Sequence, residues 1–164
     1  MSWTELSVVS EILGSLAIVI TLIYLAIQTR QNADATLANT RQELLAADQQ
    51  LLLQFIQDSE LELIRYKPEL TEREKARLGW VFVTFTRMRE NNWLQYQNGV
   101  LDKETWESYR GSIVAMFGNL RGKTWWQNYV VDFGLADPRF ASEVSELLAS
   151  APTRDRSSIL AAFD

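Results

Sequence analysis

The chain begins with a long stretch of apolar residues. Residues 6–27, LSVVSEILGSLAIVITLIYLAI, contain one charged side chain, Glu11. At about 1.5 Å per residue, a helix of this length is roughly 33 Å long, and the hydrocarbon core of a bilayer is about 30 Å thick. The pattern therefore predicts a transmembrane helix over residues 6–27, with Trp3 and Tyr24 near the two membrane interfaces.

Two other interpretations of this stretch are a buried helix of a soluble protein and a cleaved signal peptide. About 18 or more successive apolar residues are more typical of a membrane span than of a core helix. A signal peptide starts with a positively charged region and ends at small residues, whereas this stretch follows Glu5 and runs into Gln28-Thr29-Arg30. An uncleaved signal anchor fits the pattern better.

Positive charge follows the apolar stretch and does not precede it. Arg30 and Arg41 lie within about 15–20 residues after the stretch, and no lysine or arginine comes before it. Positively charged flanks are retained on the cytoplasmic side of a membrane. We therefore expect a single-pass protein with its N-terminus outside and its C-terminal body in the cytoplasm.

Small and polar residues recur along the apolar stretch with heptad spacing. If residue 7 is an a position, the a and d positions are Ser7, Ser10, Gly14, Ala17, Thr21, Tyr24 and Gln28. Helices in lipid associate through close approach of their backbones at small residues and through shared hydrogen bonds. This seam predicts a homo-oligomer, and a lone anchor is the alternative because small residues are common in membrane helices.

Glu11 lies beside this seam, one turn before Ser15. If several helices assemble, they place a ring of carboxylates near the outer mouth of the bundle, and such rings favour cations in pores. The alternative function is therefore a small homo-oligomeric cation channel with Glu11 as its ion site. Ala17 and Tyr24 would narrow the lumen, which argues against an open pore.

The helical pattern continues beyond the apolar stretch. No proline or glycine interrupts residues 15–67, and the same heptad frame runs on through Leu45, Leu52 and Ile56. We expect a helical stalk over residues 28–57 that forms a coiled coil with other copies. Its first part has glutamine and alanine in the frame, so a solvated stalk is the alternative there, and the later leucines can also join the core of the body.

Capping residues and helix breakers divide the remainder into short helices. A capping box begins at Thr71, Asp102 can cap a second helix, Asp137-Pro138 can start a third, and Asn98-Gly99 marks a stop. The expected helices cover residues 72–97, 103–117, 124–133 and 138–150. No segment alternates with period two, so we expect no sheet. The fold class is all-α: a transmembrane helix, a helical stalk, a small cytoplasmic helical bundle over residues 58–150 and a C-terminal tail over residues 151–164.

Two features of this body are candidates for binding. The segment 72–97 is apolar nearly all round at Leu78, Trp80, Val81, Phe82, Val83 and Phe85, which predicts the centre of the bundle. Farther along it, Arg87, Glu90 and Asn91 share one face, where they form either a mutually satisfied network or a polar pocket for a small ligand. The pocket would make the protein a membrane-anchored ligand sensor, a weaker alternative.

Two adjacent tryptophans, Trp125 and Trp126, must point to different sides of a helix. One ring can enter the core while the other contacts a partner protein, a second subunit or the membrane surface.

The amino-acid composition limits the kinds of partner and of chemical site that we expect. The chain has 16 basic and 21 acidic residues and a net charge of −5, so we expect no nucleic-acid partner. It contains neither cysteine nor histidine, which removes disulfides, thiolate metal sites, the commonest general base and the imidazole triads. The pairs Glu104-x-x-Glu107 and Glu143-x-x-Glu146 resemble half of a carboxylate metal site, and without histidine we expect solvated faces instead. We therefore expect no catalytic residues, no metal and no cofactor.

Three segments carry a resemblance to known proteins: EILGSLAIVITLIYLAIQTRQN at 11–32, RMRENNWLQYQNGVLDKETW at 87–106 and GKTWWQNY at 122–129. On these motifs the chain resembles a set of uncharacterised small bacterial single-span membrane proteins. The resemblance implies a helical protein anchored in the bacterial inner (cytoplasmic) membrane, and it implies no activity.

The sequence thus favours a non-enzymatic, membrane-anchored, self-assembling helical protein that acts as a scaffold or interaction module. Its expected partners are the lipid bilayer, other copies of the chain and other membrane proteins.

Overall fold

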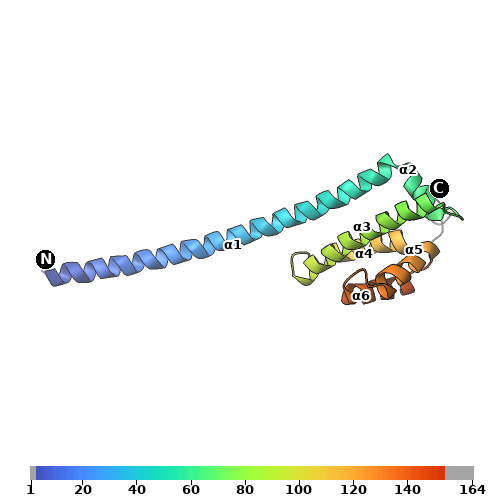
Figure 1. Ribbon diagram of the computed structural model, residues 1–164. Coiled ribbons are helices and arrows are strands. Elements are labelled where there is room, and N and C mark those ends of the chain that lie inside the picture. Colours follow the sequence, from blue (N-terminus) through green and yellow to red (C-terminus); the bar gives the residue numbers. More distant parts are fainter. Residues whose placement is uncertain (1–2, 154–164) are drawn as a thin grey trace. The chain divides into compact units, whose positions relative to one another are not determined.

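The computed structural model describes residues 3–153, apart from the side chains of Glu5, Val9, Ser59 and Glu62 (Figure 1). Within these residues the protein is all-α and has no strands, as the sequence pattern predicts. The chain divides into two compact units, Met1–Glu43 and Leu44–Asp164. Each unit is described separately below.

Helix α1, Trp3–Gln57, contains 55 residues without a break, and its first part forms the first unit. The absence of proline and the single glycine at residue 14 explain this continuity. Every described side chain from residue 3 to residue 39 is exposed. The helix is long and apolar enough from Leu6 onward to cross a membrane.

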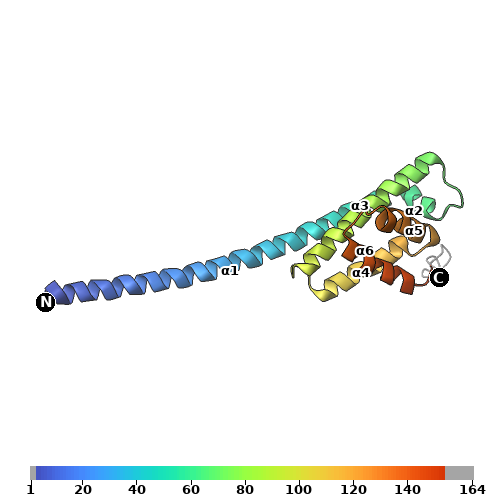
Figure 2. The ribbon, with the colours of Figure 1, turned by 60° about the horizontal axis from the view of Figure 1, so that its bottom comes forward.

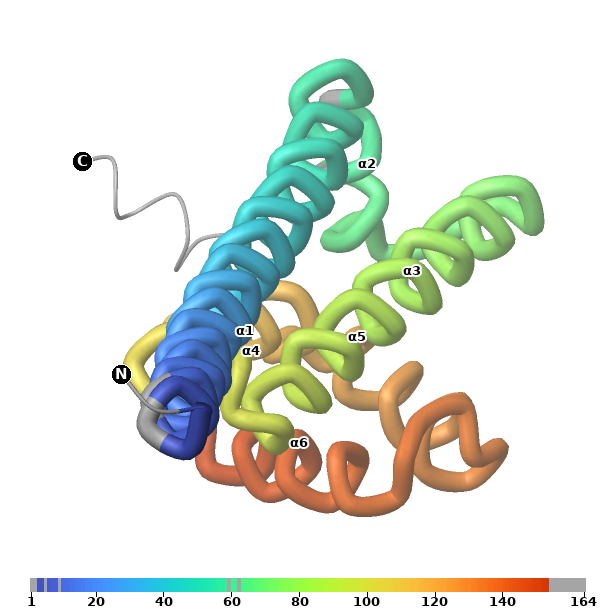
Figure 3. Tube along the Cα trace, turned by 90° about the vertical axis from the view of Figure 1, so that its left-hand side faces the viewer, coloured from blue at the N-terminus to red at the C-terminus, as the bar shows by residue number. Residues whose placement is uncertain are grey.

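The second unit begins at Leu44, so the last turns of α1 belong to it. The helices that follow are α2 (Ser59–Tyr66), α3 (Glu72–Gln97), α4 (Lys103–Phe117), α5 (Leu120–Trp125), the π-helix η1 (Trp126–Asp132) and α6 (Pro138–Ser150). Helix α4 contacts α3, α5 and α6, and it is therefore central to the packing of the bundle. Figures 2 and 3 show these helices gathered side by side. Its side chain Phe117 is fully buried against Phe82 of α3 and Trp126 of η1.

The expected caps of this unit are confirmed. The Thr71 hydroxyl accepts a hydrogen bond from the Glu74 backbone N–H, and the Glu74 carboxylate accepts one from the Thr71 N–H at 2.8 Å. Asp102 caps α4, and Asp137 caps α6 ahead of Pro138. At the end of α3, Gly99 has a φ of +73°, a conformation that glycine adopts without steric cost. Local signals therefore place most helix ends correctly.

Two expectations for the body were wrong. Helix α3 is not buried all round: Trp80 is 72% exposed, because the helix buries one face with a spacing of three and four residues, at Leu78, Phe82 and Phe85. The bundle is thus centred on α4. In addition, the helix expected over residues 124–133 begins earlier, at Leu120, and changes from α to π geometry after Trp125.

Candidate functional site

The expected oligomer seam is a fully exposed face of α1 in the first unit. Two of its hydroxyls bond within the helix: Ser10 Oγ donates to the Ser7 carbonyl at 2.9 Å, and Thr21 Oγ1 donates to the Ala17 carbonyl at 2.8 Å. A Cβ atom added to Gly14 would meet nothing within 4 Å. The fold of the single chain therefore does not require glycine here, and the position leaves room for another backbone. Tyr24 and Gln28 are also exposed.

Glu11 is exposed as well. It shares a shallow surface with Val8, Ile12 and Ser15, next to the seam. The structure therefore places the carboxylate on the outside of a single helix, beside the positions through which helices would meet.

A buried ion pair joins the end of α1 to the bundle within the second unit. Arg89 Nη1 of α3 donates to both carboxylate oxygens of Asp48, at 2.9 and 3.1 Å. The Arg89 side chain is 7% exposed and that of Asp48 is 17% exposed. The guanidinium also lies over the rings of Phe85 and Tyr109, at 4.8 and 4.6 Å from their centroids. The pair is thus enclosed by aromatic side chains from α3 and α4.

Neighbouring groups complete this buried cluster. Asn92 is fully buried, and with its amide oriented to satisfy both neighbours it accepts from Arg89 Nη1 at 2.9 Å and donates to the Met88 carbonyl at 3.1 Å. Burial raises the pKa of the Tyr109 phenol, and the negative charge of Asp48 raises it further. Tyr109 therefore stays neutral beside the carboxylate. The cluster holds three helices together and is largely buried, with Asp48 at its more exposed side.

Of the three polar residues expected to share a face, Arg87 is exposed, whereas the Glu90 side chain is only 12% exposed. Arg87 Nη1 pairs with Glu90 Oε2 at 2.8 Å, and Glu90 Oε1 accepts a hydrogen bond from the Asp137 N–H at 2.6 Å. Asn91 is exposed. The structure thus brings Arg87 and Glu90 together, and Glu90 helps to hold the start of α6.

Sequence reasoning missed the buried polar cluster of Asp48, Arg89 and Asn92. A signal for it was available in part. Asp48 falls between Leu44 and Leu51 at helical spacing, and this position is unusual for a solvated carboxylate. Its partner, however, lies 41 residues away in the sequence.

The adjacent tryptophans differ in burial. Trp126 is 3% exposed and donates from Nε1 to Ser145 Oγ at 3.0 Å. Trp125 is half-buried and stacks between Phe117 and Tyr129, with centroid distances of 5.7 and 5.3 Å. Of the two expected contact residues, Trp125 is therefore the more accessible.

An open groove of about 970 Å³ runs past Trp125. One wall comes from α3 and includes Trp80 and Val83, and the other includes Trp125 and Tyr129. The rim carries charged side chains at Glu69, Glu72, Lys75 and Arg121. The aromatic and aliphatic side chains that line the groove make it a surface on which an apolar group of another molecule could pack.

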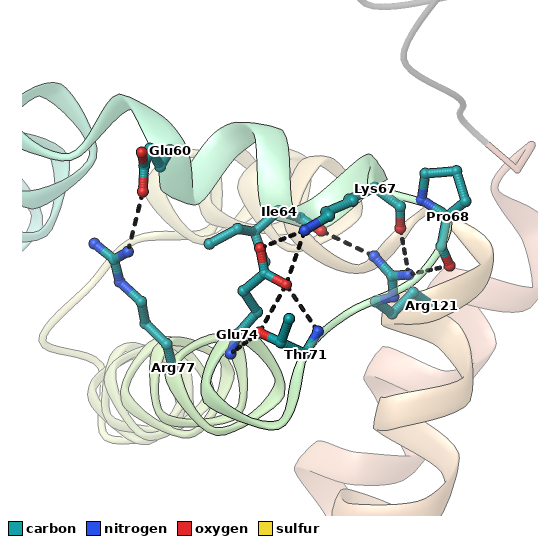
Figure 4. A network of polar contacts seen from close by, with 8 residues as sticks. All are labelled: Glu60, Ile64, Lys67, Pro68, Thr71, Glu74, Arg77 and Arg121. Carbon is teal, nitrogen blue, oxygen red and sulfur yellow. Dashed lines mark hydrogen bonds and ion pairs between the residues drawn. The ribbon is translucent and has the colours of Figure 1, made fainter.

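Arg121 on this rim is already engaged in holding the fold. Its Nη1 donates to the carbonyls of Ile64 and Arg65 at 2.9 and 3.0 Å. Its Nη2 donates to those of Lys67 and Pro68 at 2.6 and 3.3 Å (Figure 4). Carbonyls at the C-terminal end of a helix lack intrahelical partners, and a cation there is also favoured by the helix dipole. Arg121 thus caps α2 from α5.

In the same region, the Glu74 carboxylate accepts hydrogen bonds from several donors. Glu74 binds Lys67 Nζ at 2.8 Å and also accepts from the Thr71 backbone and hydroxyl (Figure 4). The hydrogen bond from Lys67, followed by that from the Thr71 backbone, lowers the pKa of Glu74 from 4.5 to about 2. Glu74 is therefore ionised throughout the physiological range.

One of the carboxylates expected on a solvated face has a different role. Glu143 is half-buried and accepts hydrogen bonds from two indoles, Trp93 Nε1 at 2.8 Å and Trp106 Nε1 at 3.0 Å. Glu146 is exposed, as expected. No group of three or more acidic residues that could hold a metal ion occurs between residues 3 and 153 where side chains are described. Glu143 thus supports the packing of two buried rings.

The chain matches no protein-family model, no curated protein and no solved structure.

Proposed function

We propose that this protein is a non-enzymatic scaffold, anchored by residues 6–27 in the inner membrane of a bacterium and assembled through the seam of α1. The observation that carries the proposal is a single unbroken helix whose first part is apolar and exposed, and whose last turns are fixed to a folded bundle by the Asp48–Arg89 pair.

Exposure of the apolar face supports the membrane anchor. The large hydrophobic side chains that the structure describes between Leu6 and Ile27 are about half exposed or more. Soluble proteins rarely present contiguous apolar surface of this extent to water. A bilayer removes this surface from water, and Arg30 and Arg41 then favour a cytoplasmic location for the bundle.

Seam chemistry supports assembly in the membrane. Because the hydroxyls of Ser10 and Thr21 bond to carbonyls of their own helix, they carry no unpaired donor into lipid. Close backbone approach at Gly14 and Ala17 is then the main attraction between copies. A parallel homo-oligomer follows, since all copies share one orientation in the membrane.

The bundle supplies the interaction surface of this scaffold. Its buried charged groups are committed to holding helices together, as at Arg89, so they are not available for chemistry. The open groove beside Trp80 and Trp125 is the surface on which we place the interaction with other membrane proteins.

Membrane extraction and mass measurement test the proposal. We expect the full-length chain to stay in the membrane fraction after alkaline washing, and to show a multiple of the single-chain mass in mild detergent. Gly14→Leu with Ala17→Leu should shift the mass toward one copy, because larger side chains hold the backbones apart. The control Ile20→Leu changes a position outside the seam and should leave the mass unchanged. A wild-type chain that is monomeric or that stays in the aqueous fraction would overturn the proposal.

Conductance measurements distinguish the scaffold function from the cation-channel function. A scaffold gives no current in reconstituted bilayers, with or without Glu11→Gln. A cation current that falls in Glu11→Gln would replace the scaffold by the channel. A small molecule retained by the protein in native mass spectrometry would favour the ligand sensor instead.

A further inference from the structure

The apolar residues in the last turns of α1 fall on two different faces. Leu44 and Leu51 are 7% exposed, and together with Phe55 they pack into the core of the bundle. Leu45 and Leu52 are 56% and 60% exposed, although each directly follows one of the buried leucines. The bundle therefore covers one face of this segment and leaves a neighbouring apolar face open.

This open face has heptad spacing. It consists of Leu45, Gln49, Leu52 and Ile56, which are separated by four, three and four residues, and Ile56 is 74% exposed. In the frame that the sequence sets with residue 7 at position a, the two leucines occupy d positions and Gln49 and Ile56 occupy a positions. Packing of the bundle thus uses c and g positions and leaves the a and d positions of the same helix uncovered.

We propose that this open face packs against the same face of a second copy, in a parallel and in-register coiled coil outside the membrane. The inference rests on the proposed function, because anchoring in one bilayer presents the same residues of each copy at the same height. In a symmetric contact, each residue of one copy then lies opposite the same residue of the other copy. Leucine at d with a β-branched residue at a favours two strands, and a polar pair at Gln49 fixes the register.

The chemistry of the face argues for a helix of this chain over a membrane surface. Residues 44–57 contain no lysine or arginine, and their one charged residue, Asp48, is paired with Arg89. Helices that lie on membrane surfaces are usually basic on the polar side of their apolar face. The open face follows the a and d stripe of the helix, with Leu53, 51% exposed, at its side, and such a narrow face suits a partner helix.

Cysteine cross-linking in the full-length chain tests this contact. The natural sequence contains no cysteine, so a single introduced thiol reports one position only. Leu52→Cys and Gln49→Cys lie on the proposed contact, and Gln50→Cys and Gln54→Cys are exposed controls outside it. Disulfides require Cα atoms about 4.4–6.8 Å apart, a spacing that in-register a and d positions approach.

In native membranes under mild oxidation, we expect the Leu52→Cys and Gln49→Cys variants to form at least about fivefold more disulfide-linked dimer than the two controls. Equal cross-linking at all four positions, or none at residues 49 and 52, would overturn the coiled coil. Mass measurement of the unmodified chain separates the two proposals. An oligomer without preferential cross-linking refutes the coiled coil alone, whereas a single-copy mass refutes the assembly as a whole.

Discussion

Asp48 and Arg89 form an ion pair in which one guanidinium nitrogen reaches both carboxylate oxygens, and the two side chains are 17% and 7% exposed. The pair joins the last turns of α1 to α3. Because removal of one partner leaves the other as a buried charge, such pairs are sensitive to single substitutions even where the intact pair contributes little net stability.

We therefore expect Arg89→Met to lower the free energy of unfolding of the bundle by about 3 kcal/mol or more. Urea denaturation of the full-length protein in detergent, followed by circular dichroism, measures this change. Lys75→Met, on the same helix, is the matched control: Lys75 and its partner Glu72 are 57% and 89% exposed, and an exposed pair contributes about 0.2–1 kcal/mol. Equal effects of the two variants would contradict the buried role of Arg89.

Two helical glycines have opposite expected effects when replaced by alanine. A Cβ atom at Gly122 would lie 2.6 Å from Phe117 Cα and 2.7 Å from its carbonyl oxygen, so α5 would have to move away from the end of α4. At Gly111, in the middle of α4, a Cβ atom meets nothing within 4 Å. We expect Gly122→Ala to destabilise the bundle by about 1–3 kcal/mol, and Gly111→Ala to stabilise it by about 0.5–1 kcal/mol.

The same urea denaturation measures both changes. The pair is informative because the substitution is identical and only the surroundings differ. A higher denaturation midpoint for Gly122→Ala would contradict the close packing of α5 on Phe117.

The features of the fold that follow from local sequence were predictable. The unbroken helix α1 follows from the lack of helix breakers, and the starts of α3 and α4 follow from the capping residues Thr71 and Asp102. These signals lie within four residues of the structure that they determine. The apolar span of α1 was likewise evident from length and composition alone.

Features that depend on distant contacts were not predictable in the same way. Arg89 and Arg87 are two residues apart and chemically identical, and only the position of Asp48 in the fold decides which of them is buried. The exposure of Trp80 has the same origin, because hydrophobicity does not reveal which face of α3 meets α4. For the candidate site, the sequence indicated the seam and its continuation through Leu45 and Leu52, and the structure added that these two leucines are exposed.

Glu143 is expected to control the packing of two buried indoles. Trp93 and Trp106 are 3% and 2% exposed, and both donate to its carboxylate. Glu143→Ala leaves two buried N–H donors unsatisfied, and one unsatisfied donor costs about 1–3 kcal/mol. We therefore expect a loss of at least about 2 kcal/mol in urea denaturation, together with a shift in tryptophan fluorescence.

Glu146→Ala is the control for this substitution, since Glu146 is exposed on the same helix and should change stability by about 0.5 kcal/mol or less. An unchanged fluorescence spectrum in Glu143→Ala would contradict the assignment of both indole hydrogen bonds.

Acid should weaken the junction between α2 and α3 through Glu74. The hydrogen bond from Lys67 and those from Thr71 lower the pKa of this carboxyl from 4.5 to about 2 in the folded protein. A carboxyl whose pKa is lowered by folding stabilises the folded state above its unfolded pKa, and this contribution is lost as the pH falls through the folded pKa. The stability advantage of the natural chain over Glu74→Gln should therefore be complete above about pH 4.5 and decline toward pH 2.

Urea denaturation of both chains across this range measures the difference. Lys67→Met should shift the decline to higher pH, because it removes the main cause of the lowered pKa of Glu74. A difference that is constant from pH 6 to pH 2 would show that Glu74 acts through packing and not through its charge.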